Sequence, residues 1–166
     1  MRSNFLLSFI RALKLPLKLL AGFLRKNKYQ EIIKKAYEPK FRKNEKRIKS
    51  LSFKFHDNVC DVKLETDTAV FQLAFGAGMW QTGETTKHGP SLVAGAKGSF
   101  VGLPPLKVAA TYTWKDENTL VLKLRYIESP HTEKMVCNFD GYNISIDIEN
   151  SFDYGNKKTT LKGKLK

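Results

Sequence analysis

The sequence predicts a mainly β protein: an antiparallel up-and-down barrel, or a sandwich, of about eight to ten strands preceded by N-terminal helices. Three observations support this fold class. Short runs in which apolar and polar side chains alternate recur throughout residues 47–166. Turn-forming Gly, Pro, Asn and Asp residues separate these runs, and no helical periodicity follows Pro39. We favour closure into a barrel or sandwich because it removes the exposed strand edges of an open sheet.

The clearest hairpin lies between residues 107 and 127. Val108–Trp114 and Thr119–Ile127 are rich in β-formers, and the polar segment Lys115–Asn118 predicts a four-residue loop between them. In the second run Lys123 and Arg125 alternate with apolar side chains. The pattern therefore predicts one apolar face and one face that carries two cations.

Other segments continue the antiparallel pattern on both sides of this hairpin. His56–Asn58 predicts a turn, and Asp140-Gly141 is a strong hairpin signal. Gly76 and Gly78 are interpreted as bend or bulge positions, since Gln81 occupies the place of the third glycine in a phosphate-binding G-x-G-x-x-G loop. The remaining predicted strands are Ile48–Phe55, Val59–Leu64, Ala69–Phe75, a short run at Ser91–Ala94, His131–Phe139, Tyr142–Glu149 and Lys157–Leu165.

The positive charge is concentrated in the N-terminal part of the chain. The net charge is +13, and residues 1–50 hold 15 Lys and Arg against 3 acidic residues, whereas the remainder holds 14 against 13. We therefore divide the chain into a basic helical arm or linker, residues 1–46, and a nearly neutral barrel domain, residues 47–166. Such an arm favours an anionic partner, although a solvated linker tolerates the same charge.

Residues 4–24 form an apolar segment interrupted by three cations. Arg11, Lys14 and Lys18 fall on one stripe of a helix, which predicts an amphipathic helix with an apolar face opposite them. A membrane-spanning helix is disfavoured, because each of these cations would cost about 2.5–3.5 kcal/mol near the bilayer centre. We expect either contact of this helix with an anionic membrane surface or packing on another domain.

No clear signal peptide is present, because cations break the apolar stretch and no small-residue cleavage site follows it. The compartment stays undetermined, with peripheral membrane association as one expectation. Residues 25–49 interleave Lys and Arg with aromatic residues but contain no nucleic-acid-binding motif, so a solvated linker is the preferred interpretation there.

The sequence indicates neither a metal site nor a cofactor. His56, His88 and His131 lie in three separate turns or loops, with no ligand spacing to another His, Cys or carboxylate. Cys60 and Cys137 each fall in a strand-like run. Two buried free thiols are the preferred interpretation, with one disulfide as the alternative.

Four parts of residues 46–166 form a recognisable series: Gly76–Trp80, Pro104–Ala110, Thr113–Trp114 with Asp116, and Leu124–Glu133. Together they resemble the C-terminal β domain of bacterial serine hydrolases of the β-lactamase or penicillin-binding-protein-like family. The resemblance implies a small lipocalin-like barrel that follows a helical catalytic domain and a linker. A serine-hydrolase catalytic domain is then the implied partner, and the basic arm is the end of that missing domain or the linker from it.

The catalytic elements of that family are absent from this chain. Its nucleophile requires a Ser-x-x-Lys pair, in which one helical turn brings the amine to the hydroxyl, and no serine here is followed by lysine at the third position. We therefore predict that the chain is not an enzyme.

The expected function is an accessory barrel that packs on a catalytic domain or binds an apolar small molecule. The alternative is an autonomous lipocalin-like carrier that the arm holds at an anionic membrane. Arg125, Glu128 and His131 form the most suggestive polar cluster, provided that Arg125 faces inward, although a solvent-facing Arg125 beside Lys123 is the preferred interpretation. The candidate ligand-binding residues are Trp80, Tyr112, Trp114, Arg125, Tyr126 and His131.

Overall fold

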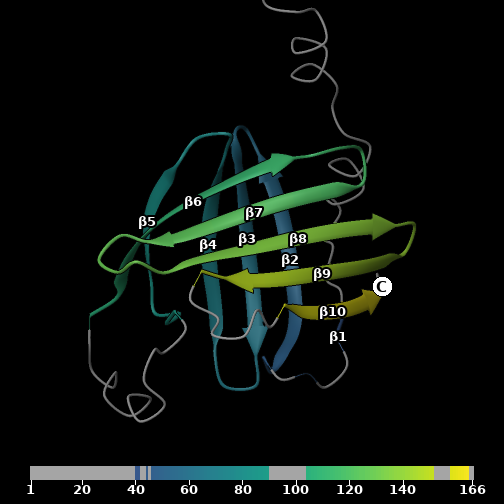
Figure 1. The fold of residues 1–166 in the computed structure, drawn as a ribbon, viewed down its shortest axis with the longest axis horizontal. Helices are drawn as coiled ribbons and strands as arrows, with labels where there is room; N and C mark the ends of the chain where they lie inside the picture. The colour runs from purple at the N-terminus through teal and green to yellow at the C-terminus, as the bar shows by residue number, and fades with distance from the viewer. Residues whose placement is uncertain (1–39, 42–43, 45, 90–103, 152–157, 165–166) are drawn as a thin grey trace, which may run out of the picture.

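The structure, a computed structural model, describes residues 40–41, 44, 46–89, 104–151 and 158–164. This part of the chain is built from ten strands joined by turns (Figure 1). The strands are β1 (Lys40–Phe41), β2 (Ile48–His56), β3 (Val59–Thr66), β4 (Val70–Ala77), β5 (Gln81–Thr85), β6 (Leu106–Trp114), β7 (Thr119–Tyr126), β8 (Thr132–Asp140), β9 (Asn143–Asn150) and β10 (Thr159–Lys164).

The strands form one curled sheet in the order β4-β3-β2-β1-β10-β9-β8-β7-β6-β5. Its strand pairs are antiparallel, except that β4 also pairs with β6 in parallel through Gly76–Thr111 and Ala77–Tyr112. Figure 1 shows that β6 to β10 lie across β2, β3 and β4 as a second layer. The two layers are thus joined at one corner by β1 and at another by the β4–β6 contact, which gives a flattened barrel.

The core lies between these two layers. Inward side chains alternate with outward ones along each long strand, as the burial pattern of β8 illustrates. Leu120, Leu122, Leu124 and Ile146 have no exposed surface. These side chains are therefore sealed from solvent at the centre of the core.

The mainly β fold and most of the predicted strands are confirmed. The four-residue loop between β6 and β7 lies at residues 115–118, as expected. Asp57 and Gly141 lie in hairpin turns with positive φ angles of 47° and 55°. The Asp-Gly turn is shifted by one residue, since Asp140 still pairs with Asn143.

The strands β1 and β5 were not predicted. Four of the five β5 residues are exposed, and only Thr85 is buried, so β5 lacks the apolar alternation on which the prediction depended. The strand β1 is two residues long and lies within the stretch assigned to the arm. It pairs with both β2 and β10, so Lys40 and Phe41 belong to the sheet.

Two further predictions fall outside the described residues: the N-terminal helices and the short strand at 91–94. Within the part of the chain that the structure describes, no helix is long and apolar enough to cross a membrane.

Candidate functional site

Polar side chains interrupt the apolar interior at one end of the barrel. The ammonium group of Lys87, just after β5, lies 3.0 Å from both carboxylate oxygens of Glu133 at the start of β8. It also donates a hydrogen bond of 3.4 Å to the hydroxyl of Tyr126 at the end of β7. The side chains of Lys87 and Glu133 are 14% and 9% exposed, so this is a largely buried ion pair.

Strand register explains why these groups face inward. Glu133 begins the inward row of β8, which continues through Met135 and Cys137, and Tyr126 ends the inward row of β7. Asn150 lies directly opposite Glu133 on β9 and extends the inward row of that strand. We call Lys87, Tyr126, Glu133 and Asn150 the polar end.

The electrostatics of the polar end follow from its burial. Burial by itself lowers the pKa of the Lys87 ammonium, but the Glu133 carboxylate and the Tyr126 hydroxyl together outweigh it, so this pKa lies above the ordinary lysine value. Burial and the Glu133 carboxylate together raise the pKa of the Tyr126 hydroxyl by more than neighbouring Lys87 lowers it. Lys87 is therefore charged and Tyr126 is neutral at neutral pH.

A close backbone approach covers this end from the β5 side. A Cβ atom on Gly89 would lie 3.3 Å from the Tyr126 ring and 3.4 Å from Cβ of His131. The backbone N–H of Tyr126 donates to the carbonyl oxygen of His131 at 3.0 Å. The chain after β5 thus packs against the ends of β7 and β8, which places Lys87 over Glu133.

Aromatic side chains gather at the other ends of the inward rows. The Phe55 ring lies 5.4 Å from Tyr112 and 6.1 Å from Trp114, between ring centroids, and Trp114 lies 5.7 Å from Phe139. These four residues, which we call the aromatic end, belong to β2, β6 and β8. They bring the two layers together by side-chain packing, which favours offset and edge-to-face rings. The buried indole N–H of Trp114 has no hydrogen-bond partner in the structure.

The structure separates the candidate ligand residues into three groups. Tyr112 and Trp114 lie at the aromatic end, whereas Tyr126 and His131 lie at or beside the polar end. Trp80 is 53% exposed in the connection between β4 and β5.

Arg125 lies on the outer face together with Lys123, so the solvent-facing alternative is the one observed. Glu128 also lies outside, where it pairs with Lys107 at 3.4 Å. The predicted cluster of Arg125, Glu128 and His131 therefore does not form inside the barrel. Arg11, Lys14 and Lys18 lie outside the described residues, and their membrane contact stays a prediction.

Sequence reasoning missed Lys87 and Glu133. Glu133 could have been found, because it occupies an apolar position in the alternation of β8. Lys87 carries no such signal, since it follows a short polar strand and lies 46 positions from its partner.

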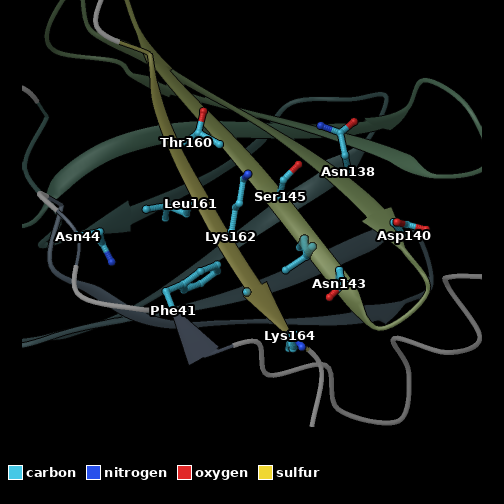
Figure 2. A pocket seen from close by; sticks show the side chains of 12 residues that line it. Phe41, Asn44, Asn138, Asp140, Asn143, Ser145, Thr160, Leu161, Lys162 and Lys164 are labelled. Carbon is cyan, nitrogen blue, oxygen red and sulfur yellow. The ribbon is translucent and has the colours of Figure 1, made fainter.

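A hollow lies on another part of the surface, along β8, β9 and β10 beside β1 (Figure 2). Its volume is about 980 Å³, and none of the predicted ligand residues lines it. Figure 2 shows the side chains of Asn138, Ser145, Thr160 and Lys162 along its strands. The hollow is thus walled by amides, hydroxyls and lysines together with Phe41, Ile144 and Leu161.

The described residues offer few other reactive groups. They include no cluster of three His, Cys, Asp or Glu side chains that could hold a metal ion. Cys60 and Cys137 are free and fully buried, which confirms the preferred interpretation of these thiols. Burial raises the pKa of both, so neither is an activated nucleophile.

Comparison with known proteins relates the fold to fatty-acid-binding proteins. No protein-family model matches the chain, and no curated protein matches it. A fatty-acid-binding protein from Drosophila melanogaster brain tissue aligns with a TM-score of 0.50 and 12% identity, over 78% of this chain and 96% of that one. The fatty acid transporter REP1-NXSQ aligns with a TM-score of 0.50 and 9% identity, over 79% and 93% of the two chains. At such identities the likeness extends to the fold alone.

A fatty-acid-binding protein from Schistosoma mansoni, in complex with arachidonic acid, also matches, with a TM-score of 0.48 and 13% identity over 84% of this chain and 78% of that one. The two alignments with a TM-score of 0.50 show that the resemblance to the C-terminal domain of serine hydrolases is wrong. Both of these neighbours are named as fatty-acid-binding or fatty-acid-transporting proteins, and the short matched segments, such as Leu124–Glu133, are parts of ordinary strands and turns.

Proposed function

We propose that this chain is a non-catalytic barrel that binds an apolar small molecule between its two layers. The observation that carries the proposal is the distribution of polarity inside the barrel. The inward rows of β7, β8 and β9 are apolar along their length, and their polar groups are confined to one end. An elongated site with a few convergent polar groups suits a molecule with an apolar body and a single polar head.

The structural neighbours support this choice among the functions that a barrel can serve. Those described above are named as fatty-acid-binding or fatty-acid-transporting proteins. Because one fold hosts many functions, their names support the proposal without deciding it.

Binding requires the barrel to open, because its core side chains are sealed from solvent. Among the described strands, backbone pairing is weakest where the short strand β1 connects β2 to β10. The strand β2 pairs with β3 along its length, but with β1 only through Ser50 and Lys40. Beyond Ser50, the aromatic side chains of Phe53 and Phe55 hold this edge against the other layer. We propose that the ligand enters here as the layers separate.

Displacement of an uncharged dye tests the proposal. The purified, delipidated protein should bind Nile red with a gain in fluorescence, and long-chain lipids should displace the dye. Leu122→Trp, which fills the core, should weaken binding by about tenfold or more, since well-packed interiors do not accommodate extra volume without strain. Lys123→Trp is the matched control, because the side chain of Lys123, the next residue along β7, lies on the outer face.

Circular dichroism establishes that each variant is folded, and Leu122→Phe replaces the tryptophan variant if that one unfolds. Failure of the wild-type protein to bind any long-chain lipid, or equal binding by both tryptophan variants, would reject an interior apolar site.

A second candidate function is that of a carrier held at an anionic membrane. The observation that favours it is the charge distribution: residues 1–50 carry 15 Lys and Arg against 3 acidic residues. The full chain should bind vesicles that contain phosphatidylserine at low salt and release them at high salt. Replacement of Arg11, Lys14 and Lys18 by glutamine should reduce binding. Equal binding to phosphatidylcholine vesicles would contradict an electrostatic tether.

A further inference from the structure

The hollow along β8, β9 and β10 presents outward side chains that have no part in the function proposed above. Three of them form one row across adjacent strands: Lys162 lies opposite Ser145 on β9, and Ser145 lies opposite Asn138 on β8. Their neighbours along the strands, such as Leu161 and Ile144, are buried, so the row lies on the outer face of the sheet. Figure 2 shows the three side chains on their neighbouring strands.

This row supplies hydrogen-bond donors. The ammonium of Lys162 and the hydroxyl of Ser145 have no hydrogen-bond or ion-pair partner among the residues that the structure describes. The side-chain oxygen of Asn138 accepts a hydrogen bond of 3.2 Å from the hydroxyl of Thr119, which leaves the amide N–H groups of Asn138 to donate elsewhere. Neighbouring strands lie about 4.8 Å apart, so one phosphate group can contact adjacent members of the row. Such a row favours an acceptor-rich anion.

The charge of the hollow also favours an anion. Lys162 and Lys164 both line it, against a single carboxylate, that of Asp140. Two positive charges and one negative charge leave a net charge of +1 in the lining. The next outward carboxylate along β9, that of Asp147, lies 2.8 Å from the Lys158 ammonium and is compensated there. The two lysines of the hollow therefore remain available to an anionic ligand.

The hollow is much larger than a single phosphate group. Its volume is about 980 Å³, and its lining includes the amide of Asn143 and the hydroxyl of Thr160. The Thr160 hydroxyl donates to the Asp147 carboxylate at 2.7 Å, so its oxygen can still accept a hydrogen bond. Phe41 adds an aromatic ring to the lining. Polar groups of both kinds beside an apolar wall suit a ligand that carries hydroxyl groups on a carbon ring.

We propose that this hollow binds a phosphate ester of a hydroxylated ring compound, such as an inositol phosphate or a sugar phosphate. The phosphate accepts hydrogen bonds from Lys162 and Ser145, and the hydroxylated ring fills the remainder of the hollow. The same chemistry occurs in compounds free in solution and in the head groups of phosphoinositide lipids. This site is independent of the barrel interior.

Calorimetry on the full chain, with inositol trisphosphate as the probe, tests the site. The trisphosphate should bind at least about tenfold more tightly than unphosphorylated inositol, because hydrogen bonds to charged groups are the stronger ones. Its affinity should fall as salt is added. Absence of binding, or equal binding of inositol, would reject the site. Neither result would affect the interior apolar site, which the Nile red assay tests separately.

Charge substitutions separate the hollow from the basic arm. Lys162→Gln combined with Lys164→Gln should weaken the trisphosphate by about tenfold or more. Lys54→Gln combined with Lys63→Gln is the matched control, because it removes the same charge from exposed positions on β2 and β3 in the other layer. The control should change the affinity by less than about twofold. Equal losses in the two double variants would show binding by overall charge and would reject the hollow.

A second test changes charge without changing side-chain size. Asn138→Asp keeps the oxygen to which Thr119 donates but replaces the amide donor by a negative charge, so binding should weaken by about tenfold. Asn58→Asp, the same change in the turn between β2 and β3, is the control. Asp140→Asn should act in the opposite direction and strengthen binding by about twofold, because it removes the carboxylate of the lining. Unchanged affinity in folded Asn138→Asp would overturn the proposal.

Vesicles distinguish the two sources of the ligand. The wild type and both double lysine variants are compared for binding to phosphatidylcholine vesicles that contain a phosphatidylinositol phosphate. Loss of binding only in the variant that lacks Lys162 and Lys164 would support the site and assign a lipid head group to it. Equal vesicle binding by all three proteins, together with the calorimetric loss for that variant, would support the site and assign a free compound to it.

Discussion

The buried ion pair at the polar end makes a sharp prediction for stability. The Lys87 ammonium lies 3.0 Å from the Glu133 carboxylate, and the Glu133 side chain is only 9% exposed. Lys87→Met removes the ammonium group and leaves this buried carboxylate without its counter-ion. Breaking a buried pair in this way typically costs about 3–5 kcal/mol in free energy of unfolding. If the m-value in urea is about 2 kcal/mol/M, the unfolding midpoint should fall by about 2 M.

The compensating variant separates the loss of a pair from the cost of an orphaned charge. Lys87→Met combined with Glu133→Leu removes both charges from the interior. The free energy of unfolding of this variant should lie within about 1 kcal/mol of the wild-type value or above it. The reason is that the attraction between two buried charges is largely offset by the free-energy cost of removing both from water. The coupling energy from the complete double-mutant cycle should therefore be large.

An exposed pair provides the control. Lys134 and Glu149 lie 3.2 Å apart, but their side chains are 41% and 43% exposed. Lys134→Met should cost less than about 1 kcal/mol, since surface pairs are screened by solvent. Urea unfolding followed by far-ultraviolet circular dichroism measures all of these variants. A loss for Lys87→Met no larger than that for Lys134→Met would refute the assignment of a buried, desolvated pair.

Three further predictions concern pH, packing and thiol access. The pKa of Lys87 is raised in the folded state, so its stabilising contribution is complete below the ordinary lysine pKa and is lost as the pH rises through the folded value. In alkaline solution the urea midpoint should therefore fall less for the variant that lacks both Lys87 and Glu133 than for the wild type. Identical alkaline profiles of the two proteins would contradict this. Gly76→Ala should destabilise the fold more than Gly83→Ala in thermal melts, because its Cβ would lie 2.6 Å from a backbone carbonyl oxygen whereas nothing lies within 4 Å at Gly83; equal losses would exclude that close contact. Cys60 and Cys137 should react with a thiol reagent only at the rate at which the barrel opens, so rapid labelling of the native protein would show that the core is not closed.

The strands of this protein were largely predictable because their signal is local. Side chains of a strand point alternately to its two faces, so an apolar row such as that of β7 identifies the strand and its buried face together. The same reasoning placed Arg125 outside beside Lys123. It failed for β5, whose exposed residues give no alternation and which is held by its backbone pairing with β6.

The candidate site was predictable only in part. Tyr112, Trp114 and Tyr126 were identified as core or pocket aromatics from their strands alone, and the structure places all three among inward side chains. Glu133 was overlooked although its position in an apolar row was visible. The family resemblance misled because short strand and turn segments recur in unrelated β proteins.

The amino-acid sequence by itself determined the fold class, the hairpins and the concentration of positive charge in the N-terminal part, because each depends on neighbouring residues or on composition. Only the tertiary structure decided which polar groups meet. Lys87 and Glu133 lie 46 positions apart, and they are joined because the curled sheet brings the end of β5 over the start of β8. Contacts of that kind depend on how the whole sheet closes, and no local pattern encodes them.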